Sequence, residues 1–147
     1  MRLSPIPFVV ARIVDSWKAL GLEFGPGCEE QVTRFKRLHD LELPSAFEMF
    51  YLAQGGMSGG ATDEKLLRFW PLIEIRPVRD HPSLEHLPSS RRYFEFMDWS
   101  IWAHTYAVDL ASAEGDVVLL GGPRVIPVAG SFAELLRLYA NNPADLL

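Results

Sequence analysis

The chain has 147 residues, of which 48% are hydrophobic and 22% are charged, a balance that fits one globular domain and excludes disordered and fibrous proteins. Its net charge of −5 and pI near 5.3 would repel nucleic acid and anionic membranes, so neither is expected as a partner. The one cysteine, Cys28, forms no internal disulfide, and the first ten residues lack the apolar stretch of a signal peptide. We therefore expect a cytoplasmic protein.

Three helices are predicted in the first part of the chain. Apolar residues in 10–17 recur at i, i+3, i+4 and i+7, which is one face of a helix. A second helix follows a loop rich in glycine and proline, and its apolar side is predicted to hold Val32, Phe35 and Leu38. A third opens at Pro44, because proline suits the first helical position, and Gly55-Gly56 ends it.

The period of the apolar residues changes after the third helix. Residues 69–75 predict a strand, with Ile73 and Ile75 on one face and Glu74 on the other. Pro71 places this strand at an edge or a bulge, since proline offers no N–H to a β-ladder. Residues 76–92 hold several prolines and charges and predict a surface loop.

The second half of the chain predicts an antiparallel meander closed by a helix. Residues 93–110 predict two strands with a turn near 98–100, and residues 117–120 and 125–128 predict a hairpin. Ser131 and Glu134 form a capping box before the last apolar run. The fold class is therefore α+β, an antiparallel meander sheet packed by N-terminal helices and a C-terminal helix, with residues 1–147 as a single domain.

Polar residues that could carry chemistry each have a plainer alternative. The spacing of His81 and His86 fits no compact metal motif, so solvated loop histidines are favoured. His104 is interpreted as a partly buried histidine before a catalytic base, and Cys28 as a packed thiol before a reactive one. The glycines of residues 55–60 favour a helix end over a phosphate-binding loop. We expect no metal, no cofactor and no catalytic residue.

Tryptophans in the strand-forming half leave three alternatives open. Trp70, Trp99 and Trp102 are expected to pack in the core, with an exposed protein-binding hot spot as the second alternative and base stacking as the third. The acidic balance of the chain disfavours base stacking, because a nucleic acid would be repelled.

Acidic residues lie in or beside the predicted sheet. Glu95 stands between Phe94 and Phe96, so it points outward if those two point inward. The alternatives are a solvated face and an acidic docking face for a basic protein. On the second alternative the candidate partner-binding residues are Asp63, Glu64, Glu95, Asp98 and Trp99.

Four segments, taken in order, resemble the SUKH superfamily. They are the acidic helix start at 29–35, the Leu-Pro helix with its closing Gly-Gly at 43–56, the aromatic strand pair that includes Trp99 and Tyr106, and the closing Ser-Phe helix at 128–136. The resemblance covers residues 25–145 and leaves residues 1–24 as an N-terminal helical addition. Gln54 departs from the asparagine that the family often has, and residues 76–92 do not align.

This resemblance implies a binding protein. Many bacterial members look like immunity proteins, which bind a toxin domain, often a nuclease, and block it; the fungal members are similar to regulatory adaptors of cell-wall assembly. The expected function is therefore an immunity protein that neutralises a cognate toxin, expected to be basic, by stoichiometric binding. A regulatory adaptor is the alternative, and an enzyme is a third.

Overall fold

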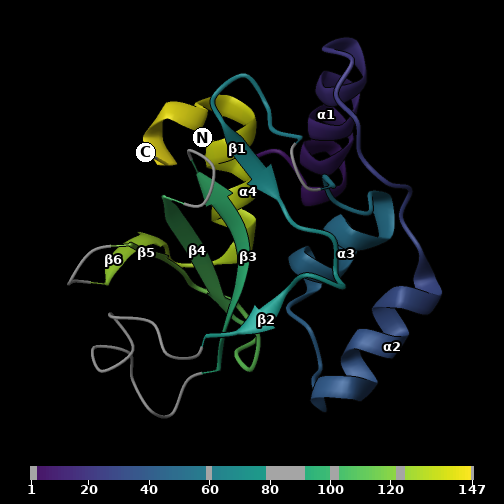
Figure 1. The fold of residues 1–147 in the computed structure, drawn as a ribbon, viewed down its shortest axis with the longest axis vertical. Coiled ribbons are helices and arrows are strands. Elements are labelled where there is room, and N and C mark those ends of the chain that lie inside the picture. Colours follow the sequence, from purple (N-terminus) through teal and green to yellow (C-terminus); the bar gives the residue numbers. More distant parts are fainter. Residues whose placement is uncertain (1–2, 59–60, 79–91, 100–102, 122–124, 147) are drawn as a thin grey trace.

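The computed structural model of this protein describes residues 3–58, 61–78, 92–99, 103–121 and 125–146 (Figure 1). Within them lie four α-helices, a short 3₁₀-helix and a six-stranded sheet whose pairings are all antiparallel. The predicted α+β class, an antiparallel sheet packed by helices, is confirmed.

The helices fall where the apolar periodicity placed them. In the described part of the chain, no helix combines the length and hydrophobicity that crossing a bilayer requires. The helices are α1 (Ile6–Ala19), α2 (Glu29–His39), α3 (Ser45–Ala53) and α4 (Phe132–Asn141), and the 3₁₀-helix is η2 (Pro143–Leu146).

The sheet is a meander with a divided edge. Its main order is β1-β3-β4-β5-β6, and β2 also pairs with β3. Because β4 occupies one edge of β3, β1 and β2 share the other edge, one beside each end of the strand (Figure 1). The strands are β1 (Leu67–Phe69), β2 (Arg76–Pro77), β3 (Tyr93–Trp99), β4 (His104–Asp109), β5 (Val117–Leu120) and β6 (Ile126–Ala129).

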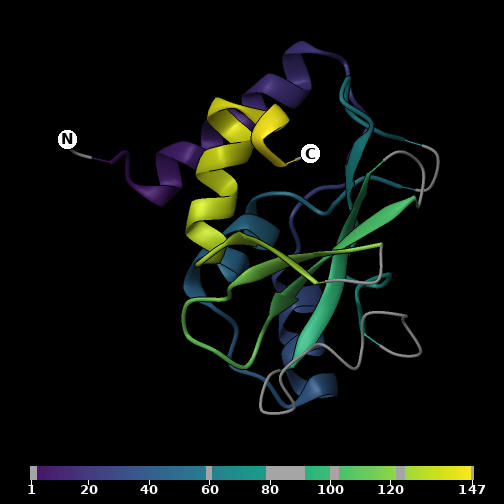
Figure 2. The ribbon, with the colours of Figure 1, turned by 90° about the vertical axis from the view of Figure 1, so that its left-hand side faces the viewer.

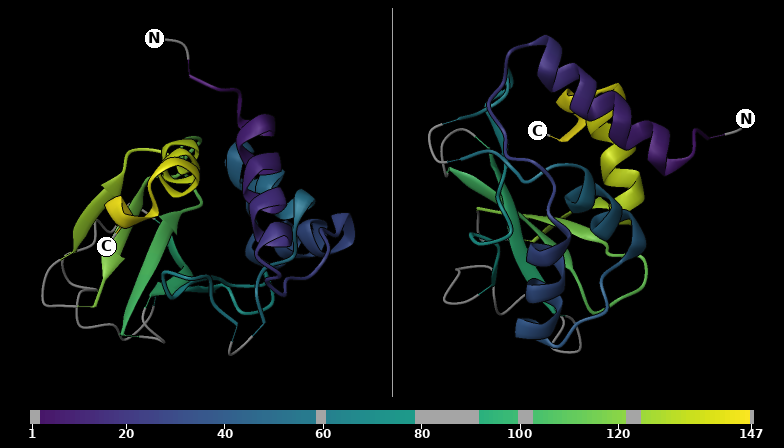
Figure 3. Two further views of the ribbon diagram at one scale, coloured as in Figure 1. Left: turned by 90° about the horizontal axis from the view of Figure 1, so that it is seen from above. Right: turned by 90° about the vertical axis from the view of Figure 1, so that its right-hand side faces the viewer.

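Helices α1, α2 and α3 lie on one side of the sheet, as the view from above in Figure 3 shows. Phe94, Phe96 and Tyr106 from the strands join the helices there in one apolar core. The other face carries a smaller apolar cluster of Tyr93, Ala107, Val118 and Leu120.

The N-terminal helix belongs to the main core. Four of its side chains are buried in the same cluster as those of α4: Val9, Val10, Ile13 and Trp17. Figure 2 shows α1 and α4 crossing next to each other, and the two helices are in contact. Residues 1–24, which the family resemblance left as an addition, therefore include a helix that the core uses.

The prediction of a strand over residues 69–75 is wrong. β1 ends at Phe69, and a turn follows in which the Glu74 N–H donates to the Pro71 carbonyl over 2.9 Å. We call residues 71–74 the Ile73 turn. Ile73 is 94% exposed and Ile75 is buried, so the two do not share a face. Pro71 has no N–H to extend the ladder, and the chain turns there instead.

The predicted N-terminus of the last helix is confirmed in its main bond. Ser131 Oγ accepts a hydrogen bond from the Glu134 N–H over 3.1 Å. The Glu134 carboxylate also reaches back, but it accepts from the Gly130 N–H at 2.9 Å, one residue earlier than a standard capping box has it. The bond from Glu134 satisfies one of the N–H groups that the helix itself leaves unpaired.

Removing the cap should weaken the fold. We expect Ser131→Ala to lower the free energy of unfolding by about 1 kcal/mol, because the Glu134 N–H loses its acceptor. Urea denaturation followed by circular dichroism would measure this. Ser45→Ala is the matched control, since Ser45 begins α3 without a side-chain cap. Equal stabilities of the two variants would contradict the prediction.

Candidate functional site

The acidic docking face predicted on the sheet is not exposed. Glu95 is only 4% exposed, Asp98 1% and Asp63 7%. Of the five predicted partner-binding residues, Glu64 is exposed and Trp99 is half-buried. The prediction that Asp63, Glu95 and Asp98 are exposed is therefore wrong.

Strand alternation explains why the error arose at Glu95. Its neighbours Phe94 and Phe96 do enter the main core, and its cross-strand partner Ala107 belongs to the cluster on the second face. The second face is covered at this point, however. Arg76 on β2 places its Nε 3.6 Å from the Glu95 carboxylate, in an ion pair of which only the arginine is exposed.

Asp98 lies in a buried charge network around Arg68. Arg68 Nε donates to Asp98 Oδ2 over 3.1 Å, and Trp70 Nε1 donates to the same oxygen over 2.6 Å. The other arginine nitrogens bond to the Glu74 carboxylate at 3.1 Å and the Met57 carbonyl at 2.9 Å. We call these groups the Arg68 network. Buried charges are tolerated only when paired in this way.

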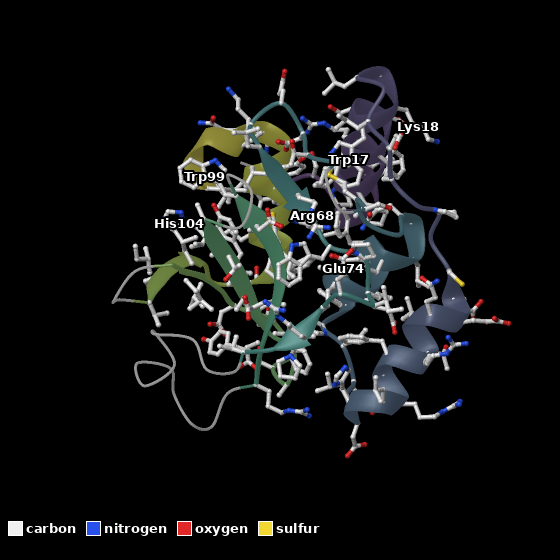
Figure 4. The ribbon with its side chains drawn as sticks, viewed as in Figure 1. Trp17, Lys18, Arg68, Glu74, Trp99 and His104 are labelled. Carbon is white, nitrogen blue, oxygen red and sulfur yellow. The ribbon has the colours of Figure 1, made fainter. Side chains whose placement is uncertain are left out.

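The Arg68 network fixes the Ile73 turn to the sheet. Glu74 is the last residue of that turn, and its carboxylate is held by an arginine that rises from β1 (Figure 4). The Nε of the same arginine is held by Asp98 on β3. The side chain before Glu74, Ile73, is therefore presented to solvent from an anchored turn.

Asp63 is tied to the two helices that cross near the chain ends. Tyr139 on α4 donates its hydroxyl to Asp63 Oδ2 over 2.6 Å, and Trp17 on α1 donates to that hydroxyl over 2.9 Å. The other carboxylate oxygen accepts the N–H groups of Lys65 and Leu67 at 2.8 and 2.9 Å. Both carboxylate oxygens are engaged, so Asp63 connects the segment before β1 to α4 and, through Tyr139, to α1.

Glu64 lines a cleft of about 570 Å³ between α1, α4 and the segment before β1. Two cations, Arg12 and Lys65, and three carboxylates, Asp15, Asp63 and Glu64, lie along it. Because charges of both signs are mixed, the lining favours neither an anion nor a cation.

Among the remaining candidates, two tryptophans are described, and both pack within the fold. Trp70 is fully buried, which confirms core packing, and Trp99 packs beside His104 with ring centroids 5.3 Å apart (Figure 4). Trp102, His81 and His86 lie outside the described residues. Among those that are described, no three His, Cys, Asp or Glu side chains are grouped as metal ligands.

An apolar groove of about 180 Å³ lies between α2 and residues 72–75. Its floor is made of the buried side chains of Phe35, Leu72 and Ile75. Two exposed aliphatic side chains stand on its two sides: Leu38 of α2, 75% exposed, and Ile73, 94% exposed. We call this surface the α2 groove. It is the candidate functional site, since exposed apolar residues gathered around a hollow mark binding surfaces.

The α2 groove was missed because each of its walls looked like core. Leu38 was predicted on the apolar side of its helix, and Ile73 on the same face of a strand as Ile75. On α2, the groove is lined by Gln31, Arg34, Phe35 and Leu38, which are spaced i, i+3, i+4 and i+7, and by His39 at the end of the helix. Placing arginine and glutamine on this face is the one sequence signal that it is not fully buried.

Comparison with known proteins identifies no relative: no protein-family model matches the chain, and no curated protein is significantly similar to it. Membership of the SUKH superfamily therefore stays a prediction, and the function has to be argued from the described geometry.

Loss of charge at Asp98 should destabilise the protein strongly. We expect Asp98→Asn to lower the free energy of unfolding by about 3 kcal/mol, because the guanidinium of Arg68 loses its most buried carboxylate partner. Chemical denaturation would measure the change. Asp15→Asn, at an exposed position, should stay within about 0.5 kcal/mol. A loss at Asp98 no larger than at Asp15 would refute the structural role of the network.

Stability should fall in strong alkali. Burial raises the pKa of the Tyr106 hydroxyl from 10 to about 12, and raises the pKa values of Tyr51 and Tyr139 further. A phenol whose pKa is raised in the folded state stabilises it below pH 10, and this contribution is lost as pH rises from 10 through 12. Urea midpoints measured across that range should decline, and the decline should be shallower for Tyr106→Phe. A midpoint that does not change with pH there would contradict this.

Proposed function

We propose that this protein is a protein-binding domain that acts by stoichiometric occupation of a partner's surface. The observation that carries the proposal is the exposed pair Leu38 and Ile73, which flanks the apolar floor of the α2 groove. Large aliphatic side chains in water gain free energy when a partner covers them, and such residues beside a pocket are typical centres of protein interfaces.

Rigidity favours the same function. Ile73 lies in a turn whose last residue, Glu74, is held by the buried Arg68. Phe35 in the floor packs against Phe94 of the sheet, with ring centroids 5.9 Å apart. A surface that is already in place loses little conformational entropy on binding, so more of the contact energy appears as affinity.

Within the class of binding proteins, we propose an immunity protein of the SUKH type that neutralises a toxin domain by occlusion. The support is the resemblance of four segments, together with the helices, antiparallel meander and closing helix in that order. The predicted basic character of the toxin no longer rests on Glu95 and Asp98, because both are engaged inside the protein.

A regulatory adaptor is the second candidate, and one observation favours it. A separate apolar groove of about 370 Å³ lies between α1 and α3, lined by Val10, Val14 and Met49 among others. Phe8 and Leu52 are exposed on the same two helices. Two apolar surfaces on different elements would allow one domain to join two partners, as an adaptor must.

Co-expression tests the function. The C-terminal domain of the protein encoded beside this gene would be produced in a bacterial host, alone and with this chain. For an immunity protein we expect growth arrest by that domain alone, recovery with this chain, and a one-to-one complex in light scattering.

A non-toxic neighbour that still forms the complex would favour the adaptor. Absence of both recovery and complex would refute the immunity function. Asp98→Asn serves as a destabilised control, since it keeps the surface sequence but weakens the fold.

A further inference from the structure

Resting on the proposed binding function, we infer that the α2 groove takes a segment of a partner protein that offers an apolar side chain with a carboxylate beside it. The apolar half of this inference comes from the groove floor. The side chains of Phe35, Leu72 and Ile75 are hydrocarbons, and the space of about 180 Å³ is several times the ~30 Å³ of one water molecule. It suits a branched aliphatic or aromatic side chain.

The acidic half comes from the cations around the groove. Arg34 lines it directly, and Arg37 lies exposed one turn further along α2. Within the described residues, neither guanidinium has an ion pair or side-chain hydrogen bond. Arg92 reaches the same end of the helix, where its Nη1 donates to the His39 carbonyl over 3.0 Å. A carboxylate of the partner can pair with Arg34 in bidentate geometry.

Among the described residues, the carboxylates near the groove form no ion pair with Arg34. Glu74 is engaged with Arg68. Glu30 precedes Arg34 by one helical turn, and the pair forms no ion pair in the described structure. The groove is thus locally basic in a protein whose net charge is −5. Contact pairs act over a few ångströms and long-range attraction over about 10 Å, so local and net charge can select different features of a partner.

The groove between α1 and α3 provides a contrast within the same molecule. Its lining is also apolar, but its one charged member among the described residues is Asp15. A segment that carries carboxylates would be disfavoured there. The charge at the rim therefore distinguishes the two grooves.

Peptide binding tests the inference. Two pools of synthetic peptides of equal length would carry central leucine or phenylalanine, one with Asp and Glu flanks and the other with Lys and Arg flanks. Fluorescence polarisation would measure their dissociation constants for the whole chain. We expect the acidic pool to bind at least about tenfold more tightly than the basic pool.

Variants locate the binding. Ile73→Ser should weaken the acidic pool roughly tenfold, and Arg34→Glu should reverse the preference between the pools. Lys18→Glu on α1, a position far from α2 in Figure 4, should leave both constants unchanged. Circular dichroism would establish that each variant is folded. Equal binding of both pools, binding of neither, or insensitivity to Ile73→Ser would overturn the inference.

Two further measurements separate this inference from the function on which it rests. Sedimentation of the wild type and Ile73→Ser would reveal a dimer formed through the groove, in which case a second copy is the occupant and the partner chemistry is refuted. In the growth assay, full protection by folded Ile73→Ser and Arg34→Glu would refute the groove as the site but leave the immunity function standing. Acidic peptides bound in the groove without any protection would refute the immunity function alone.

Discussion

Arg68 carries a positive charge into the protein interior, and much of the structure around it is arranged to compensate that charge. Its guanidinium is shared between Asp98 on β3, Glu74 after β1 and the Met57 carbonyl. A buried ion that loses one partner costs several kcal/mol, so these elements are constrained to stay together. The divided edge of β3 and the shape of the Ile73 turn both depend on this constraint.

Several carboxylates of this protein are buried, while two aliphatic side chains are exposed. Carboxylates at Asp63, Asp98 and Glu95 are inside the protein, each beside a hydrogen-bond donor or an arginine. Aliphatic side chains at Leu38 and Ile73 are outside. The buried carboxylates stabilise the fold through their hydrogen bonds and ion pairs. The exposed aliphatic side chains remain available for contact with another molecule.

A second polar connection joins the two ends of the described chain. Trp17 of α1, Tyr139 of α4 and Asp63 before β1 form one hydrogen-bonded series within an otherwise apolar core. The edge-to-face rings of Phe69 and Tyr139, with centroids 4.9 Å apart, continue it toward the sheet. Helices α1 and α4 are therefore held to the segment before β1 by directional bonds as well as by packing.

The sequence by itself determined the elements whose signals are local. Helical periodicity placed α1 to α4, the cap at Ser131 placed the start of α4, and the glycines after residue 120 placed the β5–β6 hairpin. Only the tertiary structure decided which of the outward-facing side chains are covered. Alternation fixes the side of the sheet on which Glu95 lies, but whether that side meets water depends on Arg76, which comes from a strand far away in sequence. For the same reason the exposure of Ile73 could not be predicted, because it depends on what the rest of the chain leaves uncovered. At Leu38, the arginine and glutamine on the same helix face were the one local signal of exposure.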